Sequence, residues 1–247
     1  CEIMENEKIA LFFDMDETIV STDTIFSLFD EFGKKEKGEE IYEWSKNNPK
    51  KVADLYNIPI EEVYPGMDVE LICKEIIEEN KGIPLNKFEE LVNALPIYEG
   101  AEKFFSDFMR KYGNNVFIIS SSFEPIARGI AKKLGIPIEN VIATKLLKEN
   151  EKITKFIGPV LEAEKKEDAL KEITTKNNIL LKNCVGVGDG KHDHFFIKAI
   201  TASGGLGIAV SKDKTLIENS GAQVIMSIPD YTKISTAVND FAEKLEK

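Results

Sequence analysis

The sequence predicts an α/β fold, a doubly wound and mostly parallel β-sheet with an inserted helical domain. Short apolar segments that are nearly continuous, as in strands covered on both faces, alternate with amphipathic helical patterns. Residues 23–97 show helical patterns without a convincing strand. Three of the apolar segments end in polar side chains, which is typical of a ligand site at one edge of an open parallel sheet.

Five strands are predicted from their apolar composition, over residues 8–14, 115–120, 183–189, 205–210 and 222–226. Helices are predicted between and after them, over residues 100–113, 124–135, 162–177, 192–202, 211–220 and 232–245. In the first of these helices, Ala101, Phe104, Phe105 and Phe108 recur at helical spacing, and Gly113 marks its end. Strands that alternate with helices indicate parallel pairing through right-handed crossovers.

The stretch 23–97 is predicted to be a separate helical domain, and residues 1–22 and 98–247 form the core domain. Its helices are expected at 24–33, 39–47, 69–80 and 85–94. The apolar faces of these helices favour core packing over a groove for a partner. A smaller insertion at 145–161 contains the sequence KENEK, which suits a hairpin turn.

The composition of the chain disfavours nucleic-acid and membrane partners and favours a reducing compartment. The chain of 247 residues has a net charge of −11, which disfavours nucleic acid as a partner. No run approaches the ~18 apolar residues that span a bilayer, so no membrane partner is expected. The three cysteines, Cys1, Cys73 and Cys184, are widely spaced, which favours a reducing compartment and hence a cytoplasmic location.

Acidic and hydroxyl side chains follow three of the predicted strands. Asp14 and Asp16 follow the first, Ser120 closes the second, and Asp189 and Asp193 follow the third. If these strands are neighbours, the carboxylates meet in one crevice, where they raise one another's pKa unless a cation lies among them. Oxygen ligands of this kind suit Mg²⁺, which binds a few carboxylates together with water and a substrate phosphate.

The order of these motifs resembles the haloacid dehalogenase (HAD)-like hydrolase superfamily, in particular its phosphoserine phosphatase-like branch. DMDET at 14–18 resembles the first motif, and IISSSF at 118–123 falls where the second motif closes a strand. Lys166 lies where a third-motif lysine is expected, and GVGDGKHD at 186–193 resembles the fourth motif. The resemblance covers nearly the whole chain and implies a Rossmann-like core with a helical C1 cap over 23–97.

The resemblance also implies roles for the motif residues. Asp14 would be the nucleophile that forms an aspartyl-phosphate. Asp16 would be the general acid and then the general base, and its backbone carbonyl would bind the metal. Asp14 and Asp189 would supply the side-chain metal ligands. Lys166 would neutralise charge around the phosphoryl group, although Lys165 beside it competes for this role.

The remaining candidates surround the phosphate. Ser120 would donate a hydrogen bond to it, helped by the backbone N–H groups of Ser121 and Ser122, while a helix cap is the alternative role for these serines. Asp193 would be an outer-shell acid that orients a metal-bound water or Lys166, with a plain turn residue as the alternative. His192 would lie at the rim of the site, where this branch commonly has Asn.

The sequence predicts the type of reaction more narrowly than it predicts the identity of the substrate. Asp23 lies where the branch carries an acid that meets the substrate amine, and an N-cap of the first cap helix is its alternative role. Residues 17–97 contain no arginine, the side chain whose planar guanidinium binds a carboxylate through two parallel hydrogen bonds. The predicted function is an Mg²⁺-dependent phosphomonoesterase acting on a small phosphorylated metabolite, with phosphoserine as one candidate. The alternative is a catalytically silent HAD-like protein that binds a phosphorylated ligand or a protein partner.

Overall fold

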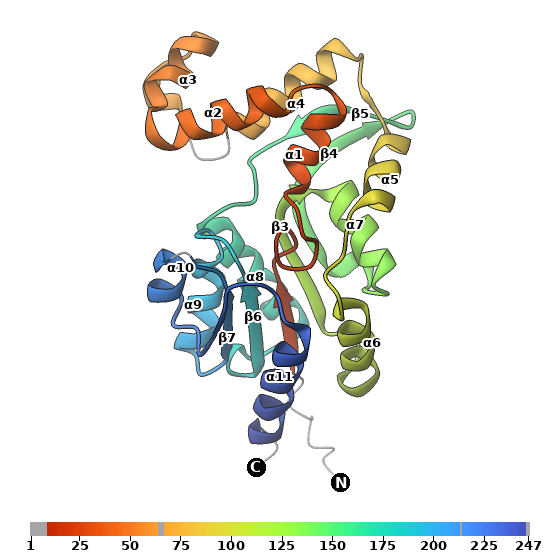
Figure 1. Cartoon of the computed structure of the whole chain (residues 1–247), viewed down its shortest axis with the longest axis vertical. Coiled ribbons are helices and arrows are strands. Elements are labelled where there is room, and N and C mark those ends of the chain that lie inside the picture. The colour runs from red at the N-terminus through yellow and green to blue at the C-terminus, as the bar shows by residue number, and fades with distance from the viewer. Residues whose placement is uncertain (1–8, 64–66, 213, 246–247) are drawn as a thin grey trace.

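Eight strands form one twisted sheet in the computed structural model, which describes residues 9–63, 67–212 and 214–245 (Figure 1). The strands lie in the order β2-β5-β4-β3-β1-β6-β7-β8. β1, β3, β6, β7 and β8 pair in parallel, β4 joins β3 in parallel, and β5 and β2 continue the sheet antiparallel. Their bounds are β1 Ala10–Phe13, β2 Ile83–Pro84, β3 Val116–Phe123, β4 Val141–Glu149, β5 Lys152–Ile157, β6 Cys184–Gly188, β7 Leu206–Val210 and β8 Val224–Met226.

The central strand β1 is buried on both faces, as its apolar sequence predicts. Leu11 and Phe13 belong to one core cluster, and Ala10 and Phe12 belong to the cluster on the other face. Because side chains alternate across a strand, this four-residue strand anchors both layers of helices. Phe12 stacks on Phe117 of β3, with ring centroids 5.0 Å apart.

Two layers of helices cover the sheet. α6 (Ala101–Tyr112), α7 (Glu124–Lys133) and α11 (Tyr231–Leu245) contribute to the first core cluster. α8 (Glu164–Asn177), α9 (His194–Ala202) and α10 (Lys214–Ser220) contribute to the second. Single 3₁₀ turns precede β4 and β6, at η2 (Ile138–Asn140) and η3 (Leu181–Asn183). The prediction of an α/β doubly wound fold is therefore confirmed.

The helical insertion lies over one end of the sheet, where α2, α3 and α4 stand apart from the core helices (Figure 1). Its elements are α1 Thr24–Glu31, α2 Lys35–Asn47, α3 Pro49–Tyr56, η1 Ile60–Glu62, α4 Met67–Glu79 and α5 Leu85–Ala94. The chain leaves and re-enters the core side by side. Ser21 N–H donates to Pro96 O at 3.0 Å, and Tyr98 N–H donates to Ile19 O at 3.0 Å. The division of domains at 22/23 and 97/98 stays a prediction.

The structure adds elements that the apolar patterns did not predict. β4 pairs with β3, although only the hairpin at 145–161 was expected. From Lys145 onward every β4 residue except Leu146 is exposed, and its buried start is too short to stand out as an apolar segment. The hairpin itself is confirmed, with Asn150 and Glu151 at its turn in left-handed backbone. α3 was also missed, and α2 begins at Lys35 rather than at residue 39.

Two of the cysteines can be placed. Cys73 and Cys184 are buried free thiols, as expected for core residues. Cys1, like residue 8 of the first predicted strand, lies outside the described residues.

Candidate active site

The predicted site residues converge at the carboxyl ends of three neighbouring strands, β3, β1 and β6. They surround a cavity of about 240 Å³ between the sheet and the insertion. Its lining contains all nine of the predicted side chains, Asp14, Asp16, Asp23, Ser120, Ser121, Lys166, Asp189, His192 and Asp193. Parallel pairing brings them together, because it places the carboxyl ends of these strands at one edge.

Lys166 carries the central positive charge of the site. Its Nζ donates to Asp14 Oδ1 and to Asp193 Oδ1, each at 2.6 Å, and all three side chains are buried. Burial would lower the pKa of Lys166, but the two carboxylates outweigh it and raise that pKa. Lys165 instead donates to the backbone oxygen of Val160 at 3.4 Å. The structure thus selects Lys166 over its neighbour.

Asp193 is held in place by backbone as well as by Lys166. Its Oδ2 accepts from the N–H groups of Asp189, at 3.1 Å, and Gly190, at 2.9 Å. A Cβ at Gly188 would lie 2.6 Å from the Cβ of Asp193, so only glycine fits at the end of β6. Both Asp193 oxygens are therefore engaged within the protein, which suits a residue that positions others.

Asp14, Asp189 and Asp193 offer carboxylate oxygens that all lie within 4.8 Å of one another. Burial raises the pKa of Asp14 to about 7, and burial together with the Asp14 carboxylate raises the pKa of Asp189 to about 9. These shifts reflect the cost of holding several carboxylates together away from water, and a divalent cation would offset it. The donor set is oxygen only, so the residues fit Mg²⁺.

Asp16 is bound to Thr24, the first residue of α1. Thr24 donates to it from the backbone N–H, at 3.0 Å, and from Oγ1, at 2.9 Å. The Thr24 hydroxyl lies 2.5 Å from Ser122 Oγ, so β3, α1 and the β1 loop meet at this point. Burial, then the carboxylates of Asp23 and Asp14, raise the pKa of Asp16 well above its ordinary value. A general acid must hold a proton before it reacts, and a raised pKa favours that form.

The serine triplet ends β3 rather than capping α7. The N-cap residue of α7 is Phe123, which makes no side-chain capping bond. Ser120 Oγ accepts from the N–H of Ser122 at 3.1 Å, and its own hydroxyl proton has no acceptor among the described residues. Ser121 Oγ donates to Leu161 O at 3.0 Å. Ser120 is thus the serine whose hydroxyl is available to a ligand, while Ser122 N–H is already used.

Asp23 and His192, at the rim of the cavity, also contact neighbouring parts of the protein. Asp23 is the N-cap of α1, where Oδ1 accepts from Phe26 N–H at 3.0 Å, and it also lines the cavity. Nε2 of His192 lies 4.0 Å from Glu162 Oε2, and burial lowers the pKa of His192 to about 4. His192 is therefore neutral at physiological pH.

Sequence reasoning missed several cavity residues. Glu162 precedes α8, and Phe26 and Tyr42 come from the insertion. Thr24 also went unpredicted, although it holds Asp16. None of these residues lies in a motif or at a strand end, so only their position in the fold reveals them.

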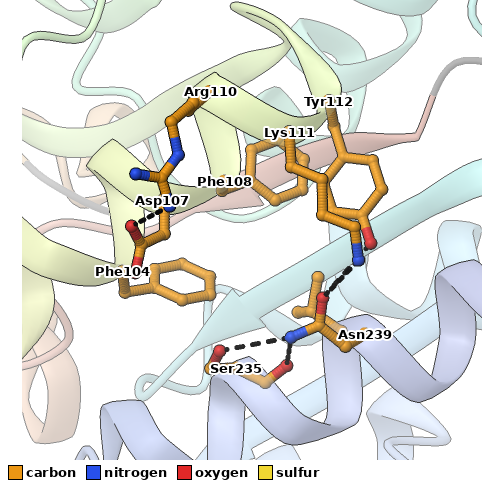
Figure 2. Close-up of a pocket in the computed structure, with 9 residues that line it drawn as sticks. Phe104, Asp107, Phe108, Arg110, Lys111, Tyr112, Ser235 and Asn239 are labelled. Carbon is orange, nitrogen blue, oxygen red and sulfur yellow. Dashed lines mark hydrogen bonds and ion pairs between the residues drawn. The ribbon is translucent and has the colours of Figure 1, made fainter.

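A second hollow, of about 380 Å³, lies between α6 and α11 (Figure 2). Its charged groups pair with side chains that line the same hollow. Arg110 pairs with Asp107 at 2.9 Å, and Lys111 and Tyr112 both donate to Asn239 of α11. It contains none of the predicted site residues.

Comparison with known proteins places this geometry in a family. The model of the haloacid dehalogenase-like hydrolase family matches residues 11–198, more than half of the chain. The chain belongs to the haloacid dehalogenase-like hydrolase family. The recognition of this family from the motifs is thereby confirmed.

Curated relatives of this HAD protein are named phosphoserine phosphatase, which agrees with the predicted class of enzyme. One, from Archaeoglobus fulgidus, is 27% identical over 85% of this chain but 54% of its own length. Another, from Methanocaldococcus jannaschii, is 26% identical over 77% of this chain and 81% of its own length. The chain thus spans about half of the first relative and most of the second.

Solved structures share the fold. A phosphoserine phosphatase with an analogue of its phospho-aspartyl intermediate has a TM-score of 0.68 and 24% identity, covering 94% of this chain and 99% of that one. A HAD family hydrolase from Salmonella enterica serovar Typhi has a TM-score of 0.72 and 16% identity, covering 94% of this chain and 73% of that one. In the described part of this chain, no helix is both long and apolar enough to cross a membrane.

Proposed function

We propose that this HAD protein is an Mg²⁺-dependent phosphomonoesterase that hydrolyses a small phosphorylated metabolite through an aspartyl-phosphate on Asp14. The observation that carries the proposal is the buried Lys166, which binds Asp14 and Asp193 at 2.6 Å beside Asp189. With Mg²⁺ bound, the charge of the three aspartates would be largely offset. The ammonium group of Lys166 is then suited to stabilise a dianionic phosphoryl group.

Each half of the reaction uses the same two aspartates. A carboxylate oxygen of Asp14 attacks phosphorus, the ester P–O bond breaks, and Asp16 gives its proton to the departing oxygen. Asp16 then takes a proton from water, whose oxygen attacks phosphorus and breaks the bond to Asp14. Inorganic phosphate leaves and the free carboxylate of Asp14 is restored.

The other residues bind and orient. Ser120 donates its free hydroxyl to a phosphoryl oxygen, and Lys166 holds Asp14 while it offsets negative charge. Mg²⁺, held by Asp14, Asp189 and the backbone of Asp16, would neutralise the phosphoryl oxygens and align them for attack. The insertion covers the cavity and excludes bulk water.

The size and cover of the cavity favour a small substrate. A volume of about 240 Å³ leaves room for a phosphoryl group and a short leaving alcohol. The curated relatives are named for phosphoserine, which makes it the reference substrate for comparison.

The test is hydrolysis of p-nitrophenyl phosphate in Mg²⁺ by the purified protein, beside the Asp14→Asn variant. We expect turnover by the parent and a loss of at least about 10³-fold in the variant, because an amide cannot act as the nucleophile. Asp168→Asn is the matched control, since Asp168 is exposed on α8. If a broad phosphomonoester panel with Mg²⁺, Mn²⁺ or Co²⁺ shows no turnover, the protein instead binds a phosphorylated ligand or a partner without catalysis.

A further inference from the structure

We infer that the preferred substrate is a phosphomonoester whose leaving alcohol carries an ammonium group and no carboxylate, as in the aminoalkyl phosphates. This inference rests on the proposed phosphomonoesterase function. It concerns the wall of the cavity formed by Glu17, Asp23, Glu162, Phe26 and Tyr42, beside the phosphoryl-handling residues.

That wall is rich in carboxylates. Glu17 follows the β1 motif, Asp23 begins α1, and Glu162 precedes α8, and all three line the cavity. They come from separate segments, so the acidic character belongs to the assembled cavity rather than to one loop. The side chain of Glu162 is only 14% exposed, which places its charge where water screens it weakly.

Positive charge is nearly absent from the same lining. Among the described residues that line the cavity, Lys166 is the only lysine or arginine, and it is bound to Asp14 and Asp193. His192 lies against Glu162 at 4.0 Å. Lys191 adjoins His192 but is not among the lining residues, and Lys165 donates to Val160 O. A substrate carboxylate would therefore meet like charges without a cation to pair with it.

Two aromatic rings complete the wall. Phe26 of α1 and Tyr42 of α2 line the cavity, with ring centroids 6.0 Å apart and planes at 81°. The two rings pack against each other edge to face while both line the cavity, and aromatic rings attract cations. Ile25 and Val69 supply apolar surface beside them. This combination of carboxylates, aromatic rings and short apolar side chains recognises an alkylammonium group.

The experiment compares phosphoethanolamine with O-phosphoserine, which differ by one carboxylate. We expect kcat/KM to favour phosphoethanolamine by about tenfold or more, the scale of one partly screened charge interaction. Glu162→Gln should lower this preference several-fold, because it removes one negative charge from the cavity wall. Glu164→Gln, an exposed neighbour on α8, is the matched control and should leave the preference as in the parent.

Binding separates the inference from the proposed function. Calorimetry on the Asp14→Asn variant should show the same preference for phosphoethanolamine without turnover. Equal or tighter binding of phosphoserine overturns the inference, even when p-nitrophenyl phosphate is hydrolysed. Turnover of p-nitrophenyl phosphate without turnover of phosphoethanolamine also overturns it. Absent turnover of every ester, with the binding preference intact, overturns the proposed function and leaves the ligand class standing.

Discussion

Lys166 offsets the negative charge of the acidic site through its ion pairs with Asp14 and Asp193. It places one positive charge among Asp14, Asp193 and Asp189 in a region that water hardly reaches. Removing one member of a buried ion pair leaves the others uncompensated, and this costs about 3–5 kcal/mol in measured cases. Under the proposed function, the lysine would have a structural and a catalytic effect at once.

A pair of variants separates these two adjacent lysines. Lys166→Gln should lower kcat for p-nitrophenyl phosphate by about 10²–10³-fold, because a positioned donor to the phosphoryl site is lost. It should also lower the free energy of unfolding by about 3 kcal/mol in urea titrations. Lys165→Gln is the matched control and should change neither value appreciably. Equal effects of the two substitutions would contradict the assignment of Lys166.

Thr24 links Asp16, the proposed general acid, to the insertion. It donates twice to Asp16 and is the first residue of α1. Thr24→Val should lower kcat about tenfold or more for an alkyl phosphate, whose leaving oxygen needs a proton. The effect should be small for p-nitrophenyl phosphate, because p-nitrophenolate departs without protonation. Thr24→Ser keeps the hydroxyl and should retain most activity, and an equal loss with both esters would exclude a role through Asp16.

At the scale of elements, the insertion is tied to the core through α5 and α7. A Cβ at Gly129 of α7 would lie 2.7 Å from Val92 Cγ2 of α5, so the two helices approach closely at this glycine. Lys133 of α7 also donates to Val92 O. β2, between α4 and α5, pairs with β5 and adds a second link. The cover over the site is therefore anchored at one side.

Substitution at the glycine tests this contact. Gly129→Ala should destabilise the protein by about 1–3 kcal/mol, because overpacking outweighs the helix propensity of alanine, which alone favours it by about 1 kcal/mol. In the Val92→Ala background, which removes the clashing methyl groups, the same substitution should be neutral or stabilising. Urea unfolding of the four proteins gives the coupling energy. Additive effects would show that the helices do not meet at this position.

At the scale of the whole molecule, charge and stability are linked through the metal. The chain carries a net charge of −11, and its active site gathers three carboxylates within 4.8 Å. Because Mg²⁺ would bind the folded site and not the unfolded chain, it should stabilise the fold by mass action.

The effect of removing Mg²⁺ should be measurable as a change in Tm, without an assay of activity. Saturating Mg²⁺ at about 100 times its dissociation constant should contribute about 2.7 kcal/mol, which corresponds to a rise in Tm of several degrees for a chain of this size. Mg²⁺-free buffer with EDTA should abolish both the shift and turnover. Asp189→Asn should remove most of the shift, and exposed Asp168→Asn should keep it. A shift that survives Asp189→Asn would place the ion elsewhere.

Much of the fold and of the site follows from local patterns. Apolar runs such as residues 10–13 predict buried parallel strands, and acids that directly follow them must reach the same edge of the sheet. For this reason Asp14, Ser120 and Asp189 were predicted to converge, and they do. β4 escaped prediction because its residues after Thr144 are mostly exposed, which leaves no long apolar run.

The sequence by itself determined the α/β class, the helical insertion and the family, since these depend on periodicity and on motif order along the chain. Only the tertiary structure decided that Lys166 rather than Lys165 is buried, that Thr24 holds Asp16, and that Glu162 joins the cavity wall. Periodicity describes which face of an element is apolar. Contacts between segments far apart in the chain depend on how those faces pack, so no local pattern specifies them.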